Sequence, residues 1–348
     1  MLEHPIRYVV FRYGHHSPHS GYSKLPEFGL NHYDGEVIPV SKPLPRSIIR
    51  ERLLWRLAKG TPGYDRASMA AELKVAVKIL QEKEYIYHFL YGEKTYHYTG
   101  LLNNIRNNRI IATFHLPPVG IRQAVQIEWH IRQLSAVICL GTNQQEYFED
   151  ILEPEKIFFV PLGLDTEYFT PPPSFDSRDP NLCLFVGENY RDFPTFRGVL
   201  ELVAYKFPEI QFVAVLPSRS FELIGKHPNL ELRSGIPESD LLKLYRTASV
   251  MVMPVKEAVA NNAVLESMAC GLPLVVTDVG AIRDYVTPDT AVLVKPYDSR
   301  GMAKAVIDLL NNSDKRQRLS KKTREQALKF SWPIVVQQLR SIYYKVAG

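Results

Sequence analysis

The sequence predicts an α/β protein with two doubly wound domains, each built on a parallel sheet. Its 348 residues suggest two domains, because one domain usually takes about 100–200 residues. Short apolar, β-branched runs alternate with helical stretches from one end of the chain to the other. Because these runs are apolar on both faces, they are typical of parallel strands that helices cover on both sides.

Two series of strands follow one another along the chain. The first series is expected at 6–13, 36–40, 85–90, 109–115, 136–141 and 157–163. The second is expected at 181–187, 210–217, 229–235, 250–255, 273–279 and 291–296. Helical segments are predicted between them at 66–83, 119–134, 192–207, 237–248, 262–270 and 298–312.

The boundary between the domains is predicted in 164–180, which is rich in Pro, Asp and Ser and has no periodicity. We therefore expect one domain over 1–165 and another over 175–330. The tail from residue 314 is helical, and Pro333 after Trp332 predicts a new helix that turns away from the previous one.

The composition excludes fibrous, wholly disordered and membrane-spanning proteins. Hydrophobic residues make up 45% and charged residues 23%, and no apolar run approaches the roughly 18 residues of a spanning helix. The first residues lack the order of a signal peptide. Cys139, Cys183 and Cys270 lie in apolar surroundings, so we expect buried thiols in a cytoplasmic protein rather than disulfides or a metal site.

The net charge of +5 is concentrated in residues 41–60, which hold six basic residues and one acidic residue. Apolar residues such as Trp55 lie between these charges. The pattern fits a segment on an anionic membrane surface, which would place the protein on the inner face of the cytoplasmic membrane. It fits a solvated helix packed on its domain equally well. We expect no nucleic-acid partner.

Loops that follow strands are where a ligand site is expected in parallel sheets. The first such loop, 14–25, contains His15, His16 and His19 together with two glycines and several hydroxyl groups. No carboxylate or Cys is near in sequence, so a binding loop is favoured over a metal site.

Histidines mark two of the later strands. His115 ends the strand 109–115 and opens a loop, where a His can hydrogen-bond a substrate hydroxyl or a developing charge. His88 lies within its strand and is predicted to be a core residue. Glu93, in the loop beyond, is a weaker polar candidate.

The C-terminal half offers a phosphate-binding arrangement. Gly187 permits close backbone approach after a strand, and Arg191 could clamp a diphosphate with its planar guanidinium. Asn261 or Asn262 can cap the helix 262–270, whose N-terminus favours a phosphate. Glu266, one turn into that helix, could accept hydrogen bonds from the two hydroxyls of a ribose.

At these segments the chain resembles the retaining glycosyltransferases of family 4 (glycosyltransferase group 1). The strongest likeness lies in ANNAVLESMACGLPLVVTDVGAIRDYV (260–286), VPLGLDTEYFTP (160–171) and LFVGENYRDF (184–193). IATFHLPP and HSGYSKL in the N-terminal half agree more loosely. The fold that this resemblance implies is GT-B, in which two Rossmann-like domains face each other across a cleft. It also implies that a C-terminal helix, 333–348, returns to the N-terminal domain.

The resemblance implies that the C-terminal domain binds a nucleotide-sugar donor. Glu266 matches the second glutamate of the family's E-x7-E motif, which holds the ribose hydroxyls, whereas the first position is Ala258. Either Glu257 contacts the sugar after a one-residue shift, or Asn261 and Asn262 replace the missing glutamate. The residues expected at the diphosphate or sugar are Asn262, Ala263 and Val264, through their backbone N–H groups. Arg191 is the best substitute for the family's cations after Gly187, Arg219 is the next candidate, and Ile236 falls where the backbone recognises the base.

The N-terminal domain is implied to bind the acceptor through His19, Ser20, Gly21 and Tyr22, with His115 against the donor sugar. The implied reaction moves a hexosyl unit from a UDP- or GDP-sugar to a hydroxyl of a glycan or lipid-linked acceptor. Configuration is retained, and His115, Arg191 and Glu257 are the candidate catalytic residues. No metal or other cofactor is expected. The alternatives are a nucleotide-sugar-binding protein without transferase activity and a GT-B isomerase that acts on the nucleotide sugar itself.

Overall fold

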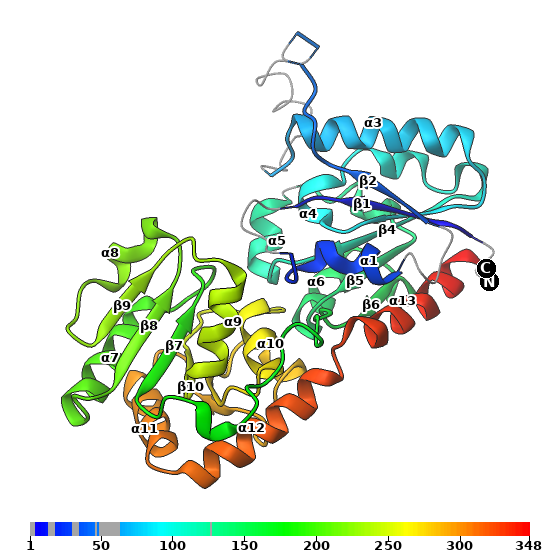
Figure 1. The fold of residues 1–348 in the computed structure, drawn as a ribbon. Helices are drawn as coiled ribbons and strands as arrows, with labels where there is room; N and C mark the ends of the chain where they lie inside the picture. Colours follow the sequence, from blue (N-terminus) through cyan, green and yellow to red (C-terminus); the bar gives the residue numbers. More distant parts are fainter. Residues whose placement is uncertain (1–3, 13–17, 30–34, 46, 49–62, 126) are drawn as a thin grey trace. The chain divides into compact units, whose positions relative to one another are not determined.

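The computed structural model describes residues 4–12, 18–29, 35–45, 47–48, 63–125 and 127–348. The chain forms two compact units (Figure 1). The N-terminal unit comprises Met1–His16, Ser20–Gly163 and Trp332–Gly348, and the C-terminal unit comprises Ser17–His19 and Leu164–Ser331. Each unit is described by itself.

The N-terminal unit is built on a six-stranded parallel sheet. Its strands are β1 (Ile6–Val10), β2 (Gly35–Pro39), β3 (Ile86–Phe89), β4 (Arg109–Phe114), β5 (Ala136–Cys139) and β6 (Ile157–Phe159). They lie in the order β2-β1-β3-β4-β5-β6, and every neighbouring pair is parallel. The order reverses between β1 and β3, as in flavodoxin-like doubly wound sheets.

Helices and single turns connect these strands. They are η1 (Tyr22–Lys24), α1 (Leu25–Gly29), α3 (Arg66–Gln81), α4 (Gly92–Thr95), η2 (Thr99–Leu102), η3 (Ile105–Asn107), α5 (Pro118–Ala124), η4 (Ile131–Gln133), η5 (Thr142–Gln144), α6 (Gln145–Glu149), η6 (Pro154–Lys156) and α13 (Trp332–Ala347). The predicted helix over 119–134 is wrong, because α5 ends at Ala124 and Val125 is extended at φ −122° and ψ 95°. The buried side chains of Val125 and Ile131 belong to the same apolar core, so packing overrides the helical pattern there.

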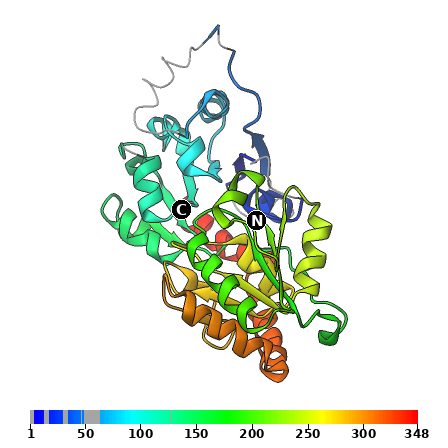
Figure 2. The same ribbon diagram turned by 90° about the vertical axis from the view of Figure 1, so that its left-hand side faces the viewer.

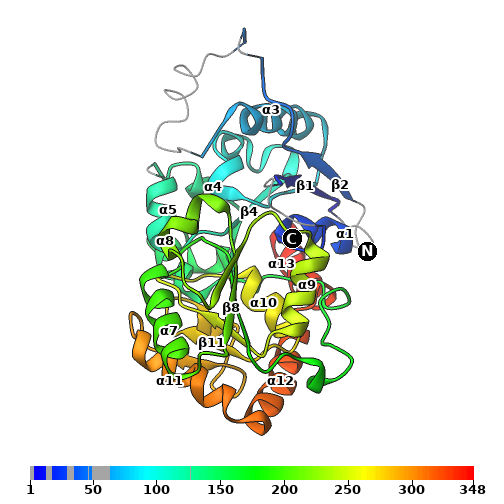
Figure 3. The same ribbon diagram turned by 60° about the vertical axis from the view of Figure 1, so that its left-hand side comes forward.

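The last helix, α13, completes the N-terminal unit. α12 ends at Leu328 and α13 begins at Trp332; in Figure 2 the orange part of the chain leads into the red C-terminal helix. Trp332 is buried, and its ring stacks near Phe28 with centroids 5.9 Å apart. α1 and α13 lie side by side (Figure 3). The predicted return of the C-terminal helix to the first domain is confirmed.

The C-terminal unit is built on a second six-stranded parallel sheet. Its strands are β7 (Leu182–Val186), β8 (Gln211–Val215), β9 (Leu230–Arg233), β10 (Val250–Met253), β11 (Leu274–Thr277) and β12 (Val292–Val294). Their order is β12-β11-β10-β7-β8-β9, and all neighbours are parallel. This is the strand order of a Rossmann sheet, with its reversal between β7 and β10.

The second sheet is covered on both faces. Its helices and turns are η7 (Phe175–Ser177), α7 (Phe193–Lys206), η8 (Ser218–Ser220), α8 (Phe221–Ile224), α9 (Glu238–Thr247), α10 (Asn262–Ala269), η9 (Ile282–Asp284), α11 (Ser299–Leu310) and α12 (Ser313–Leu328). α7 and α11 pack together on one face, and α9 and α10 lie on the other (Figure 1). Asp192 caps α7 by accepting a hydrogen bond from the Thr195 N–H at 3.3 Å.

The predicted fold class is confirmed: both series of strands form parallel, doubly wound, Rossmann-like units. The three cysteines are buried thiols without a disulfide, as expected. In the described ranges no helix is long and apolar enough to cross a bilayer. Most of the basic segment 41–60 lies outside the described residues, as do His15 and His16.

Candidate functional site

The candidate residues gather at the strand-order reversals of the two sheets. In open parallel sheets the connections on either side of such a reversal run to opposite faces, which leaves a crevice beyond the carboxyl ends of the strands. The loops after β7 and β10 carry Arg191 and Asn261, whereas those after β1, β3 and β4 carry Tyr22, Glu93 and His115. Each unit therefore has one half-site, described separately below.

Arg191 is the centre of the half-site in the C-terminal unit. Its side chain is buried and folds back on the turn after β7: Nε donates to the Val186 carbonyl at 2.9 Å and Nη1 to the Asn189 carbonyl at 2.8 Å. Nη2 donates to Asn261 Oδ1 at 3.4 Å, across the reversal. Burial lowers the pKa of Arg191 to about 10, so the guanidinium remains charged at neutral pH. These bonds use three of its five N–H groups and leave two for an anion.

Gly187 makes room for this guanidinium. Its φ is +90°, a backbone conformation that L side chains rarely adopt, and a Cβ atom there would lie 2.7 Å from Arg191 Nη2. Gly187 was predicted to let a ligand approach the backbone closely. In the structure, the absence of a side chain at Gly187 makes room for the Arg191 guanidinium.

The N-terminus of α10 lies next to Arg191. Asn261 is its cap, and Oδ1 accepts a hydrogen bond from the Val264 N–H at 3.3 Å. Asn262 and Ala263 occupy the first turn, where backbone N–H groups have no partner within the helix. An arginine and a helix N-terminus at one point suit a phosphate group, since each attracts negative charge.

Glu266 is buried one turn into α10. The Tyr245 hydroxyl, on α9, donates a hydrogen bond to Glu266 Oε2 at 2.9 Å. This bond fixes the carboxylate in one orientation.

Arg219 and Glu188 form an ion pair at the ends of β7 and β8. Ser220 Oγ also donates to Glu188 Oε2, at 2.7 Å. Glu188, which interrupts the family pattern directly after Gly187, therefore neutralises the second predicted cation. Ile236 is half-buried in the loop after β9 and follows Gly235 at φ +63°.

Glu257 lies in the loop between β10 and α10. Its Oε1 accepts a hydrogen bond from the Ala258 N–H at 3.0 Å. A Cβ atom on Gly280 would come within 2.3 Å of the same oxygen, so the Glu257 carboxylate lies against the backbone after β11.

His19 clusters with the C-terminal unit, although Ser20, Gly21 and Tyr22 belong to the N-terminal unit. Its ring stacks on Tyr168 with centroids 3.7 Å apart, and Nδ1 donates to Asp165 Oδ2 at 2.7 Å. Its backbone N–H donates to Glu238 at 3.2 Å. The four residues predicted to act as one acceptor loop are thus divided between the units.

In the N-terminal unit, His115 sits in an aromatic frame. It stacks on Tyr91 with centroids 4.2 Å apart and meets the edge of Tyr22 at 5.0 Å. Nε2 donates to the Leu90 carbonyl at 2.7 Å, and the backbone N–H donates to Glu93 Oε2 at 3.3 Å. Burial raises the pKa of Glu93 to about 7, so this carboxyl titrates near neutrality.

A chain of buried hydrogen bonds runs beneath this half-site. His88 Nδ1 lies 2.7 Å from the Tyr343 hydroxyl and Nε2 lies 2.7 Å from Thr113 Oγ1, which donates to the Tyr22 hydroxyl at 3.3 Å. Burial lowers the pKa of His88 to about 3, so the ring is neutral and can accept at Nδ1 and donate at Nε2. The prediction that His88 is a core residue is confirmed.

Sequence reasoning missed three residues that shape the half-sites. Tyr245 orients Glu266, and Tyr91 supplies the ring on which His115 stacks. Gln144 is buried, and its Nε2 donates to the carbonyls of Phe114 and Leu116 at 3.0 and 2.8 Å, which fixes the loop around His115. None of these three residues lies in a motif. The only signal in the sequence is that each lies near the end of a strand or helix.

Within the described part of the chain, no group of three or more His, Cys, Asp or Glu side chains is arranged to hold a metal ion.

Comparison with known proteins supports the expected family resemblance. The family described as "Glycosyl transferases group 1" matches residues 220–326, which include α9, α10 and Glu266. A curated relative, MMP alpha-(1->4)-mannosyltransferase of Mycolicibacterium hassiacum, is 28% identical over 208 residues, 56% of this chain and 49% of that protein. The chain spans about half the length of the first curated relatives it matches, with 49%, 39% and 50% covered.

Solved structures share the fold. Sucrose-phosphate synthase from Thermosynechococcus elongatus superimposes with a TM-score of 0.71 at 17% identity, covering 99% of both chains. Anabaena HepE, solved in complex with UDP, gives a TM-score of 0.71 at 13% identity over 97% of this chain and 99% of that chain. At such identities the likeness concerns the fold. The resemblance predicted from the residues is confirmed: residues 220–326, in the C-terminal unit, match the group 1 glycosyl transferases, and the chain has the GT-B fold.

Proposed function

We propose that this protein is a retaining glycosyltransferase that moves a hexosyl unit from a nucleotide diphosphate sugar to an acceptor hydroxyl. The observation that carries the proposal is the contact between Arg191 and Asn261 at the strand-order reversal of the second sheet. It joins a buried cation to a helix N-terminus where a Rossmann sheet binds ligands.

In this proposal the C-terminal unit binds the donor. The two remaining N–H groups of Arg191 and the first turn of α10 face the diphosphate, and Glu266 accepts hydrogen bonds from the ribose. The backbone at Ile236 contacts the base, and Glu257 contacts the sugar. We take a UDP- or GDP-sugar as the donor class; the group 1 match to 220–326 supports a glycosyl donor, and the solved complex of HepE with UDP supports the uridine nucleotide.

The proposed step is a front-face substitution. The bond between the sugar C1 and the diphosphate oxygen breaks, and a bond from C1 to the acceptor oxygen forms on the same face. The acceptor proton passes to the departing phosphate. Arg191 and the α10 N-terminus stabilise the charge that grows on that phosphate, which is the largest effect a preorganised site can supply. Because protein groups fill this role, we expect EDTA to leave the rate unchanged.

The N-terminal unit is proposed to bind the acceptor. The buried rings of Tyr22 and Tyr91 hold the half-buried His115 ring in place, and His115 is the side chain proposed to face the sugar. A protonated Glu93 carboxyl can donate one hydrogen bond, and an ionised one only accepts. The charge of Glu93 therefore changes what the half-site offers an acceptor hydroxyl.

The test begins with a thermal-shift panel of UDP, GDP and their hexose conjugates. A ligand that binds only the folded protein stabilises it by roughly 2.7 kcal/mol at one hundred times its dissociation constant. The stabilising nucleotide sugar, labelled in its hexose, is then incubated with acceptor alcohols and the products are separated. We expect a labelled α-glycoside, and Arg191→Lys should lower kcat more than it raises KM. Donor binding without any product would favour the binding protein, and an altered nucleotide sugar without an acceptor would favour the isomerase.

A lipid-linked acceptor is proposed from the charge of residues 41–60. Each Lys or Arg near an anionic surface contributes about 1 kcal/mol. Flotation with vesicles that contain phosphatidylglycerol tests this idea. The wild type should float at low salt, and a variant with Arg50, Arg52 and Arg56 changed to Glu should not. A wild type that remains at the bottom would direct the search to glycan acceptors in solution.

A further inference from the structure

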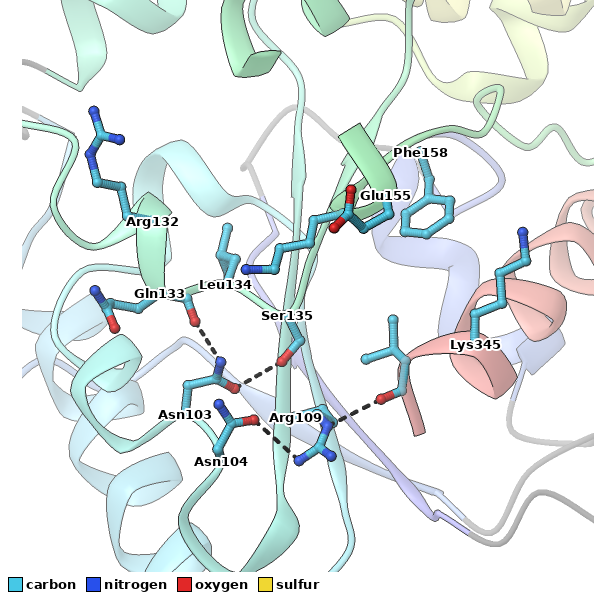
Figure 4. Close-up of a pocket in the computed structure, with 12 residues that line it drawn as sticks. Asn103, Asn104, Arg109, Arg132, Gln133, Leu134, Ser135, Glu155, Phe158 and Lys345 are labelled. Carbon is cyan, nitrogen blue, oxygen red and sulfur yellow. Dashed lines mark hydrogen bonds between the residues drawn. The ribbon is translucent and has the colours of Figure 1, made fainter. Parts of the chain in front are cut away.

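A basic cavity lies in the N-terminal unit at the edge of the sheet opposite the half-site. It has a volume of about 650 Å³. Its walls come from the amino ends of β4, β5 and β6, at Arg109, Ser135 and Lys156, and from the last turn of α13, at Lys345 (Figure 4). His115 follows the other end of β4, so roughly 20 Å of strand separates the cavity from the half-site.

The charge of the lining is strongly unbalanced. Four cations line the cavity, Arg109, Arg132, Lys156 and Lys345, against the single carboxylate of Glu155. Lys156 has an ion pair with Glu153 at 2.8 Å. Among the described residues no carboxylate lies within ion-pair distance of the other three cations. Like charges held together repel, and a bound anion removes that repulsion.

Arg109 is fixed in place yet keeps donors toward the cavity. Nε donates to the Val346 carbonyl at 3.1 Å, and Nη1 donates to Asn104 Oδ1 at 3.2 Å. Both bonds are drawn in Figure 4. Nη2 makes no hydrogen bond to any described residue. A guanidinium oriented in advance by the protein loses little entropy when it binds a phosphate or carboxylate.

The rest of the lining is suited to hydroxyl groups and to one flat face. Asn103 donates to the Gln133 carbonyl at 2.6 Å and accepts from Ser135 Oγ at 2.9 Å, which makes the floor rigid. The side-chain amide of Gln133 has no hydrogen bond within the described ranges, so it can serve a ligand. Phe158 presents a ring with Lys345 Nζ at 5.7 Å from its centroid.

We propose that this cavity binds a small phosphorylated polyol, such as a sugar phosphate, at a site separate from the transfer site. A phosphate monoester carries about −1.5 to −2 charges at neutral pH, which matches the excess of cations. The cavity falls within the roughly 300–1,000 Å³ of small-molecule pockets and is far larger than a bare phosphate needs. The amide and the ring of the lining then contact the polyol.

Calorimetric titration of the full chain with glucose 6-phosphate and, separately, inorganic phosphate tests the proposal. Arg132 and Lys345 are exposed, so Arg132→Gln/Lys345→Gln removes two cations without opening a core. The matched control, Arg318→Gln/Lys321→Gln, removes two exposed cations from α12 in the other unit.

We expect glucose 6-phosphate to bind saturably and more tightly than inorganic phosphate. The cavity variant should weaken binding at least tenfold, the control should not change it, and saturating UDP should not compete. The inference is independent of the proposed function, since a chain that fails to transfer sugar or to bind UDP can still pass this test. Absent binding, equal weakening in both variants, or competition by UDP would each overturn it. Vesicles of phosphatidylinositol phosphate that bind through the same cations, when glucose 6-phosphate does not, would reassign the site to a lipid headgroup.

Discussion

Replacing Gly187 with Ala tests the arrangement of the donor half-site through a single methyl group. The backbone at Gly187 has φ +90°, so any L side chain is strained there by about 1–2 kcal/mol. The new Cβ would also lie 2.7 Å from Arg191 Nη2 and 3.3 Å from Cζ, so the buried guanidinium must move. Moving it disrupts hydrogen bonds from a charged donor to the carbonyls of Val186 and Asn189, each worth about 1.5–3 kcal/mol. The strain and the two lost hydrogen bonds together should cost roughly 4–8 kcal/mol of stability.

Gly225→Ala is the matched control, because Gly225 has a similar φ of +82° and a Cβ there meets nothing within 4 Å. It should cost only the backbone strain, about 1–3 kcal/mol, because φ +82° and ψ −171° lie in a region almost confined to glycine. Amide hydrogen exchange of peptides from β7 measures the local free energy of opening, which matters because the two units need not unfold together. In an Arg191→Ala background the extra cost of Gly187→Ala should vanish. A full extra cost in that background, or equal costs at both glycines, would refute the reasoning.

Three further outcomes are expected. Glu266→Gln should weaken nucleotide diphosphate binding about 10- to 150-fold in a calorimetric titration, since a charged acceptor is lost, while the melting temperature stays near that of the wild type; unchanged affinity would remove Glu266 from the site. Burial raises the pKa of Glu93 from 4.5 to about 7, so the folded protein binds this proton more tightly than the unfolded chain does. The free energy of unfolding should therefore fall by on the order of 3 kcal/mol as the pH rises from about 4.5 to 7. Chemical denaturation at a series of pH values should show this fall in the wild type and not in Glu93→Gln. Gly163→Ala places a Cβ 2.1 Å from Trp332 Cε3, so it should lower the free energy of unfolding by about 1–3 kcal/mol or more and change the tryptophan emission. Gly63→Ala, whose Cβ would have its nearest atom at 3.7 Å, should change neither.

The central strands were predictable because both of their faces are buried. β7 and β10, inside the runs 181–187 and 250–255, consist of apolar residues alone, whereas the outer strands β2 and β9 are more exposed. The segment 119–134 misled because Ile121 and Val125, and again Ile131 and Leu134, are spaced four and three residues apart, as on a helix. In the structure Val125 has an extended backbone after α5, and Ile131 belongs to the separate turn η4. The spacing of apolar residues alone does not distinguish one continuous helix from a short helix followed by an extended segment and a turn.

The places of the candidate site residues in the fold were predictable, but their hydrogen-bond and ion-pair partners were not. The sequence places Arg191 after a strand and Asn261 before a helix, which is enough to bring them to the same strand-order reversal, where they contact each other. It does not show that Arg191 is buried and bonded to its own turn, or that Glu188 pairs with Arg219. Such pairings depend on side-chain directions that only the packed fold determines. Tyr245 was missed for the same reason. It lies on the largely polar helix α9, and nothing in the sequence indicates that its hydroxyl donates a hydrogen bond to the Glu266 carboxylate.

The place of α13 has a consequence for the order in which the chain folds during synthesis. The C-terminal unit is continuous from Leu164 to Ser331 apart from a three-residue piece, so its strands and helices emerge together. The N-terminal unit lacks Trp332 and the rest of α13 until the whole of the C-terminal unit has been synthesised, although its six strands are made first. Its core, including the ring that lies against Gly163, therefore closes last. Domains generally fold from the N-terminus onward during synthesis. Here the N-terminal unit is synthesised first but stays incomplete, with apolar surface exposed, so it is the unit that a chaperone would bind.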